Sequence, residues 1–266
     1  MQLIGKSILL KLFKPNLDSH KGDNGRILII AGSEKYHGAL LLAIQAASRL
    51  VDIVYVHSPE NQKLVQKLKS EISVFITINK KELFKTVDLV DAVLIGPGLD
   101  ENENTKHILK QILHKYSDKR IVVDATALWQ LNPKWLHSNC IITPHVREFR
   151  KLFGCASNKE NVLKMAKKYN CLVVLKGKYD YVSDGKQLFE NRTGNVGMTK
   201  GGTGDVLAGL VTALAAKNDN LLSAQAGVYL NGLAGDKLYK KFKTFYNAGD
   251  LAENLGEVWR QLVTEQ

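Results

Sequence analysis

The sequence is poor in the features that hold together small secreted proteins, metal modules and membrane proteins. Its three cysteines, Cys140, Cys155 and Cys171, stand far apart, without the spacing of a zinc site or the even number of a disulfide framework. No apolar run reaches the ~18 residues that a membrane span needs. The N-terminal apolar patch is followed by no small-residue cleavage site, which argues against a signal peptide. We therefore expect a protein of the reducing cytoplasm.

Aromatic residues are also few, and this affects how the basic charge is interpreted. The chain has a formal net charge of +11, from 37 Lys and Arg against 26 Asp and Glu. Nucleic-acid binding is one explanation of such a charge, but the lysines are scattered and few aromatic residues interleave with them as stacking platforms. A solvated surface explains the charge better, and attraction of anionic small molecules comes second. Nucleic-acid binding is the weakest alternative, and it predicts that binding to a duplex or a single strand would depend steeply on the salt concentration.

The sequence lacks internal repeats, low-complexity linkers and a clear domain boundary. Its 266 residues, 45% of them apolar, suffice for a large core, and we expect one α/β domain over 1–266. Runs rich in Val and Ile predict strands at 26–31, 53–57, 74–78, 92–95, 121–124, 140–143 and 172–176. Helix-like segments lie at 38–50, 60–69, 105–116, 148–153, 159–169, 206–214, 221–242 and 248–262. Continuous apolar strands suit burial on both faces, so the alternation predicts a three-layer α/β/α fold around one mainly parallel sheet.

One glycine-rich stretch, 195–214, joins a polar loop to an apolar helix. Gly201, Gly202 and Gly204 precede Asp205 and the helix. Glycine permits positive φ and close approach of a ligand, and a helix N-terminus offers free N–H groups and partial positive charge to an anion. Asp205 at this end is either a helix N-cap or a base beside an anion site.

Two common phosphate loops are absent from this stretch. No Gly-Lys-Ser/Thr follows at the spacing of a Walker A loop. Leu207 stands where the third glycine of a dinucleotide fingerprint belongs. The density of glycine and threonine still favours a phosphate site.

Polar and glycine residues follow most of the predicted strands, where ligands bind in sheets of this kind. Three of these positions have two interpretations each. Asp124 either caps the next helix or faces a ligand. His145 either caps a helix with Glu148 in its first turn or contacts a ligand. Lys176 is either a snorkelling surface lysine or a phosphate contact. We do not assign Asp124, His145 and Glu148 as metal ligands.

Motifs along most of the chain carry a family resemblance. They are His20-Lys21-Gly22-Asp23, 25–33, Gly38-Ala39, 95–99, 123–125 with 127–128, Thr143-Pro144-His145 with 148–149, 175–177, 193–195 with 197–198, 200–209 and 229–236. The chain resembles the NAD(P)H-hydrate dehydratases, carbohydrate-kinase-like domains of ribokinase-like fold, and the subgroup that it resembles has no lid. The Gly-Gly-Thr-Gly-Asp segment is specific only to the superfamily. The HKGD start, the GPGL turn and the TPH turn together narrow the resemblance to this family.

The resemblance implies two sets of binding residues. The substrate, NADHX or NADPHX, would contact Ala39, Gly98, His145, Val146, Arg147, Glu148, Phe149, Arg150, Lys151 and Asp205. The nucleotide would contact Lys176, Gly177, Lys178, Tyr179, Asp180, Asn195, Val196, Gly197, Met198, Thr199, Lys200, Gly201, Gly202, Thr203 and Gly204.

The implied reaction is an ADP- or ATP-driven dehydration of (6S)-NADHX or NADPHX. The C6 hydroxyl would be phosphorylated and then leave as phosphate, restoring NADH or NADPH. Asp205 would act as the base, while Gly202, Thr203 and Gly204 would hold the transferring phosphoryl group. Mg²⁺ would bridge nucleotide oxygens and use few protein carboxylates. Neither the donor, ADP or ATP, nor a preference for NADHX or NADPHX can be read from the sequence.

Several positions depart from the family pattern. Val146-Arg147 stand where Pro-Gly is expected, Asn231 stands where histidine is frequent, Gly249 stands where a small hydroxyl residue is frequent, and Asp100 replaces a glycine. None of these changes removes a group that the mechanism requires. Many relatives carry an N-terminal epimerase domain, whereas this chain begins almost at the HKGD motif. We therefore expect it to act with a separate epimerase, and to form a homo-oligomer such as a tetramer.

Two other functions remain as alternatives. A ribokinase-like small-molecule kinase, acting on a hydroxymethyl-pyrimidine or thiazole alcohol, would use the same loop and Asp205, but its product would keep the phosphate. A nucleotide-sensing or scaffold protein would keep the fold without turnover.

Overall fold

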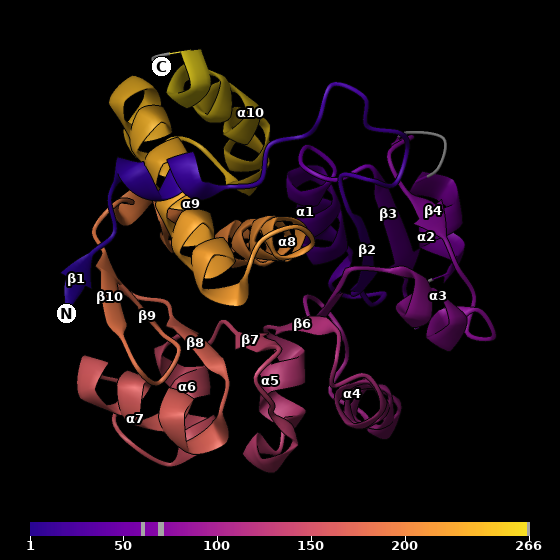
Figure 1. Cartoon of the computed structure of the whole chain (residues 1–266). Coiled ribbons are helices and arrows are strands. Elements are labelled where there is room, and N and C mark those ends of the chain that lie inside the picture. Colours follow the sequence, from indigo (N-terminus) through magenta and orange to yellow (C-terminus); the bar gives the residue numbers. More distant parts are fainter. Residues whose placement is uncertain (60–61, 69–71, 265–266) are drawn as a thin grey trace.

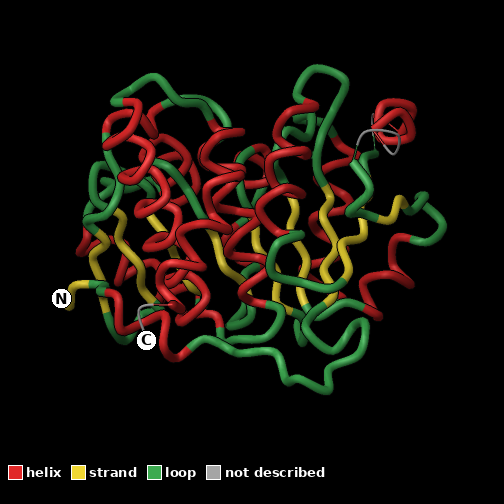
Figure 2. Tube along the Cα trace, turned by 90° about the horizontal axis from the view of Figure 1, so that it is seen from above, coloured by secondary structure: helices red, strands yellow, loops and turns green. Residues whose placement is uncertain are grey.

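One ten-stranded sheet runs through the computed structural model, which describes residues 1–59, 62–68 and 72–264 (Figure 1). The strands are β1 (Gln2–Leu3), β2 (Arg26–Ile30), β3 (Ile53–His57), β4 (Ile76–Thr77), β5 (Ala92–Ile95), β6 (Arg120–Val123), β7 (Cys140–Ile142), β8 (Leu172–Leu175), β9 (Asp180–Ser183) and β10 (Leu188–Asn191). Their order is β1-β10-β9-β8-β7-β6-β5-β2-β3-β4. The strands β2 to β8 run parallel, and β9 is antiparallel to both β8 and β10. Figure 2 shows them side by side across the molecule.

Helices cover both faces of the sheet. The α-helices are α1 (His37–Ala47), α2 (Gln62–Leu68), α3 (Leu83–Leu89), α4 (Glu103–Lys115), α5 (Thr126–Gln130), α6 (Val146–Phe153), α7 (Lys159–Tyr169), α8 (Thr203–Ala215), α9 (Asn220–Phe242) and α10 (Ala248–Thr264). Short 3₁₀ helices are η1 (Lys6–Lys11), η2 (Pro133–Trp135) and η3 (Val196–Thr199). Figure 1 shows α1, α8 and α9 on one face and α4 to α7 on the other. The predicted three-layer α/β/α fold is therefore confirmed.

Alternate side chains of each strand enter two different cores. In β2, Leu28 and Ile30 pack with the helices α3 to α7, whereas Ile27 and Ile29 pack with α1, α8 and α9. All four side chains are fully buried. This two-sided burial explains why the strands read as continuous apolar runs. A third apolar cluster joins α8, α9 and α10 above the second core.

Short and edge elements differ from the sequence predictions. The strand predicted at 74–78 shrinks to β4, and the helix predicted at 60–69 is seen as α2, with residues 60, 61 and 69 lying outside the described residues. The helices α3 and α5, the two-residue strand β1 and the β9–β10 hairpin were not predicted. Each offers too few apolar positions for a periodic pattern. The hairpin pairs within the main sheet, at its β1 end.

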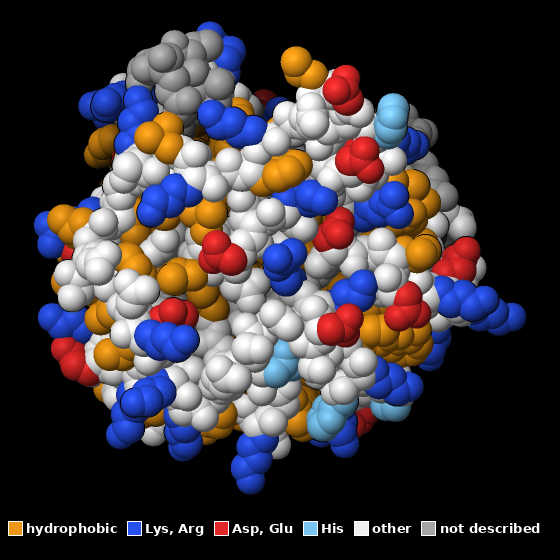
Figure 3. Space-filling model, in the orientation of Figure 1, with side chains coloured by type: hydrophobic (Ala, Val, Ile, Leu, Met, Phe, Trp, Pro, Cys, Tyr) orange, Lys and Arg blue, Asp and Glu red, His pale blue; other side chains and the backbone are white. Residues whose placement is uncertain are grey.

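The surface agrees with the interpretation of the basic charge as solvation. On the face shown in Figure 3, lysine and arginine side chains are spread out with acidic side chains between them. In the part of the chain that the structure describes, none of the helices combines the length and apolar character that crossing a bilayer demands.

Candidate active site

The N-terminus of α8 lies where residues that follow the strands converge. Gly202 occupies the N-cap position with φ +97°. A Cβ there would lie 2.5 Å from Leu42 Cδ1 and 2.8 Å from Ala248 Cβ, so both conformation and space require glycine. Thr203 Oγ1 donates to the carbonyls of Met198 (2.8 Å) and Lys200 (3.1 Å). The loop is therefore held against the first turn of the helix.

Asp205 is the third residue of α8, so its interpretation as the N-cap is wrong. Its carboxylate makes no hydrogen bond or ion pair with any residue that the structure describes. Burial, and then the charge of Asp124, raise the pKa of Asp205 to about 7, although Lys176 acts in the opposite direction. A partner-free carboxylate with such a pKa at a helix N-terminus has the properties of a general base.

A buried ion pair lies beside this carboxylate. Lys176 Nζ, just after β8, is 2.7 Å from Asp124 Oδ1, just after β6. Asp124 is 1% exposed and the Lys176 side chain 19% exposed. The N-cap of α5 is Ala125, so Asp124 is not that helix's cap, and Lys176 is not a snorkelling surface lysine. A Cβ on Gly204 would lie 3.3 Å from Lys176 Nζ, which places the ammonium at the start of α8.

The charged groups in this cluster shift one another's pKa values. Burial lowers the pKa of Lys176, but the charges of Asp124, Glu148 and Asp205 outweigh burial, so its net pKa is raised. Burial raises the pKa of Glu148, and Lys176 opposes that shift. One cation is thus shared among three carboxyl groups, and it stays protonated at neutral pH.

His145 and Glu148 form the predicted capping box of α6. His145 Nδ1 accepts from the backbone N–H groups of Arg147 and Glu148, both at 3.1 Å, and Glu148 Oε2 accepts from the His145 N–H at 2.8 Å. Burial, followed by the charge of Lys176, lowers the pKa of His145. The imidazole is therefore neutral and held by α6, so the local interpretation of His145 is confirmed.

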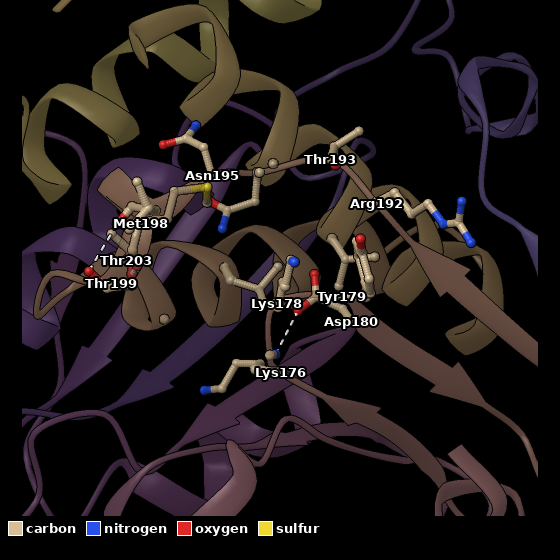
Figure 4. A pocket seen from close by; sticks show the side chains of 18 residues that line it. Lys176, Lys178, Tyr179, Asp180, Arg192, Thr193, Asn195, Met198, Thr199 and Thr203 are labelled. Atoms are coloured by element: carbon tan, nitrogen blue, oxygen red, sulfur yellow. Dashed lines mark hydrogen bonds between the residues drawn. The ribbon is translucent and has the colours of Figure 1, made fainter. Parts of the chain in front are cut away.

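Two cavities open on either side of the α8 N-terminus. The first has a volume of about 600 Å³ and contains most of the residues predicted to bind nucleotide, which are Lys176, Gly177, Lys178, Tyr179, Asp180, Asn195, Val196, Met198, Thr199, Thr203 and Gly204. Figure 4 shows Lys176, Asp180, Asn195 and Thr203 placed around it by separate elements. Asp180 holds its β8–β9 turn, since Oδ1 accepts from Gly177 N (3.1 Å) and Oδ2 from Asn191 Nδ2 (3.0 Å).

The second cavity also has a volume of about 600 Å³. It brings together four residues predicted to bind substrate, which are Ala39, Gly98, Lys151 and Asp205. Its other walls come from Tyr36, Leu99, Asp100, Glu101, Ala125, Thr126 and Trp129. Ala125 has φ 49°, a strained conformation for a residue with a Cβ, and such strain is common at functional sites.

Some of the predicted residues do not line either cavity. For nucleotide these are Gly197, Lys200, Gly201 and Gly202, and for substrate they are His145, Val146, Arg147, Glu148, Phe149 and Arg150. Lys200 Nζ instead donates to the carbonyls of Thr244 and Tyr246. The Phe149 side chain is fully buried in the core, 4.9 Å from the Phe153 ring centroid.

Other lining residues were not predicted from the sequence. Trp129 lies on α5, and Lys151 Nζ lies over its ring, 4.4 Å from the ring centroid. Arg192, Thr193, Leu207, Val228 and Asn231 line the first cavity. Thr193, Leu207 and Asn231 fall inside motifs of the family, but they were given no binding role, because they come from the loop after β10, from α8 and from α9, and meet only in the folded chain.

Comparisons with known proteins agree with this geometry. The family model described as NAD(P)H-hydrate dehydratase matches residues 27–257. The bifunctional NAD(P)H-hydrate repair enzyme Nnr of Methanocaldococcus jannaschii is 38% identical over 96% of this chain and 52% of its own length. The ADP-dependent (S)-NAD(P)H-hydrate dehydratase of Nitrosopumilus maritimus is 35% identical over 95% of both chains. The chain thus spans about half the length of the first curated relatives that it matches.

Solved structures share the fold. A ribokinase-like superfamily protein of Enterococcus faecalis superposes with a TM-score of 0.88 at 24% identity, over 98% of this chain and 96% of its own. The ADP/ATP-dependent NAD(P)H-hydrate dehydratase of Bacillus subtilis, co-crystallised with ATP and Mg²⁺, superposes with a TM-score of 0.84 at 24% identity over 98% of both chains. The fold is therefore ribokinase-like. With a family model matching most of its length and two relatives above 30% identity, the chain belongs to the NAD(P)H-hydrate dehydratase family.

Proposed function

We propose that this chain uses ADP or ATP to dehydrate (6S)-NADHX or NADPHX back to NADH or NADPH. One observation carries the proposal. Asp205, free of protein partners and with a pKa of about 7, lies at the helix N-terminus that separates two cavities of about 600 Å³ each. Each cavity is large enough for a nucleotide-sized ligand. A base between two such cavities suits transfer of a group from one ligand to the other.

The donor nucleotide occupies the cavity beside Lys176. Its terminal phosphate meets the free N–H groups of Thr203 and Gly204 at the start of α8, together with the helix dipole. Lys176, fixed by Asp124, adds a full positive charge next to Gly204. These groups are already oriented before reaction, so they stabilise the charge on the transferring phosphoryl group without reorganisation.

The hydrated nicotinamide occupies the cavity lined by Ala39, Gly98 and Trp129, with its C6 hydroxyl at Asp205. Asp205 takes the hydroxyl proton as the oxygen attacks the terminal phosphorus, and the bond between that phosphorus and the nucleotide breaks. The C6–O bond of the phosphorylated intermediate then breaks, phosphate leaves, and loss of a proton from C5 restores the ring double bond. The sum is hydrate and ATP to NADH, ADP and phosphate, or the same with ADP and AMP.

Mg²⁺ fits this site only as an ion held largely by phosphate oxygens. No group of three or more His, Cys, Asp or Glu side chains in the described ranges is arranged to hold a metal. Asp124 and Glu148, two buried carboxyl groups whose charges act on Lys176, are the residues that would face its water shell. When bound, Mg²⁺ would neutralise phosphate charge.

The proposal also covers the epimer used, the cell compartment and the assembly of the chain. The site acts on the S epimer, and an epimerase activity supplies that epimer from the R form. We place the reaction in the cytoplasm and the chain in a homo-oligomer, as a single domain.

The deciding experiment is an assay of purified chain with NADHX and Mg²⁺, with ADP or ATP. We expect the NADH absorbance to recover and one phosphate to be released for each NADH formed. Phosphate retained on the organic product would support the small-molecule kinase instead. If the NADH absorbance recovers with neither nucleotide, the dehydratase proposal is wrong.

A further inference from the structure

Asn231 is a buried amide on the α9 wall of the nucleotide cavity. Its side chain is 5% exposed. Oδ1 has no hydrogen-bond partner among the described residues. Other buried polar atoms of the described residues also lack a partner, Asn220 Oδ1 of the same helix among them, so what distinguishes Asn231 is that it lines the nucleotide cavity.

Two amides at and just after the end of β10, those of Asn191 and Asn195, are satisfied within the protein. Asn191 Nδ2 donates to Asp180 Oδ2 (3.0 Å) and to the Val228 carbonyl (3.2 Å). Asn195 Nδ2 donates to Asp236 Oδ1 (3.0 Å), and its Oδ1 accepts from Tyr246 Oη (2.8 Å). Asn231 differs from these two residues in lacking a protein partner for its oxygen, and it lines a cavity that a ligand could occupy.

Apolar groups from α8, α9 and η3 share the lining of this cavity with Asn231. Gly232 brings α9 so close to the loop after β10 that a Cβ would lie 2.1 Å from Thr193 Oγ1. Val228, Leu207 and Met198 add apolar surface to the cavity. The phosphate-binding groups, Lys176 and Gly204, belong to β8 and α8 instead. The lining of the cavity thus combines charged groups, apolar surface and one amide whose oxygen has no protein partner.

We propose that Asn231 recognises the base of the donor nucleotide and selects adenine over guanine. A carboxamide presents one donor and one acceptor side by side, and half a turn of the group exchanges them. Adenine offers a matching pair at its N6/N7 edge, the N6 amino donor with the N7 acceptor, which is the pairing that asparagine makes with this base. Guanine offers two acceptors, O6 and N7, at the same edge, so one of its atoms would face the carboxamide oxygen. This inference rests on the proposed nucleotide-dependent reaction.

The test compares Asn231→Leu with the parent chain, using ADP, ATP, GDP and GTP. We expect the variant to lose about 10- to 100-fold in kcat/KM with adenine nucleotides, mainly through KM, and to lose its preference for adenine over guanine. Asn231→Asp has nearly the same volume and lacks the donor, so it should show the same loss if Asn231→Leu does not fold. Gln225→Leu removes another buried amide of α9 that lines a different groove, and it should keep the adenine preference.

Titration calorimetry of the same nucleotides with each variant separates this inference from the proposed function. Adenine selectivity lost in Asn231→Leu and kept in Gln225→Leu supports the role of Asn231, even without turnover of NADHX. Adenine selectivity unchanged in Asn231→Leu, or absent in the parent chain, overturns that role and leaves the dehydratase proposal standing if turnover persists. No nucleotide binding at all by the parent chain overturns both.

Discussion

At the level of single residues, Asp205 is destabilised in its charged form by its own position. Burial and the nearby charge of Asp124 both raise its pKa, and the cation of Lys176 compensates only in part. A carboxylate in this condition gains more from receiving a proton than an exposed one does. The reactive group is therefore costly to the fold, which is common at functional sites.

Replacing Asp205 by Asn should nearly abolish turnover while the nucleotide still binds. Asn cannot accept the hydroxyl proton, so we expect kcat to fall by about 10³- to 10⁴-fold. Nucleotide affinity, measured by calorimetry, should change by less than about tenfold, because Lys176 and the α8 N–H groups remain. Turnover by the variant equal to that of an active parent would exclude Asp205 as the base. An inactive parent would instead favour a scaffold function.

Turnover should depend on pH through Asp205. Only the ionised carboxylate is a base, so kcat/KM should fall tenfold per pH unit below an apparent pKa of about 7. Between the ordinary pKa of aspartate and about pH 7, the Asp205 carboxyl group is protonated in the native state but ionised in the unfolded chain. Stability from this group is therefore present at low pH and is lost as pH rises through about 7. A pH–rate profile checks the kinetic part, and a flat profile from pH 5 to 8 would contradict it.

Breaking the buried pair should lower both stability and turnover. In Asp124→Asn, Lys176 keeps a buried charge without its partner, so we expect a loss of about 3 kcal/mol in the free energy of unfolding and a lower kcat. Denaturant unfolding measures the first and the NADHX assay the second. In the double variant Asp124→Asn, Lys176→Met, neither member of the ion pair is left charged without the other, so stability should recover in part while turnover stays low. A single variant as stable as the parent would show that the pair contributes little.

At the level of elements, α8 positions the site because it packs against α1 with almost no side chain between them. A Cβ on Gly209 would lie 2.4 Å from the Ala43 carbonyl oxygen and 2.8 Å from Ala43 Cα. These are backbone atoms, so they cannot rotate away. The N-terminus of α8 is thereby fixed relative to α1, whose Ala39 lines the second cavity.

Gly209→Ala should separate the two helices and destabilise the protein. We expect a loss of about 1–3 kcal/mol, as for overpacked cores, visible as a lower Tm and a lower denaturant midpoint. Gly38→Ala is the control in the partner helix. No atom lies within 4 Å of its added Cβ, so alanine there should be neutral or slightly stabilising. An unchanged Tm in Gly209→Ala would mean that α8 shifts freely against α1.

At the level of the whole molecule, each cavity draws its walls from segments far apart in the chain. The nucleotide cavity uses β8, the loop after β10, α8 and α9, and the substrate cavity uses α1, α5, α6 and the loops after β5 and β6. The first turn of α8 contributes to both. A ligand in either cavity therefore joins elements that the backbone connects only indirectly.

Nucleotide binding should raise the Tm of the whole chain. At 100 times Kd, a ligand that binds only the native state adds about 2.7 kcal/mol, which for a chain of this size corresponds to a rise of roughly 5–10 °C. Differential scanning fluorimetry with ADP or ATP measures the rise, and Asp205→Asn should retain it. A nucleoside without phosphate should give a much smaller rise, since the groups around Lys176 would have no charge to bind. Equal shifts with both would contradict the assignment of the phosphate end.

The sequence by itself determined the layered fold and the glycine-rich loop before α8, because both are encoded locally. Strands buried on both faces must be apolar throughout, and a loop that needs positive φ at Gly202 must place glycine there. The His145–Glu148 capping box was likewise readable, since its two residues are three apart. Short elements such as α5 escaped prediction because a single turn carries no period.

Only the tertiary structure decided which of two roles the remaining residues have. Asp124 and Lys176 are 52 residues apart and meet because β6 and β8 flank β7. Asp205 lost its assignment as a cap when the helix was seen to begin at Thr203, two residues before it. Asn231 gained its importance from a cavity formed by four distant elements. Pairing and burial across such distances depend on packing, and packing leaves no periodic trace in the sequence.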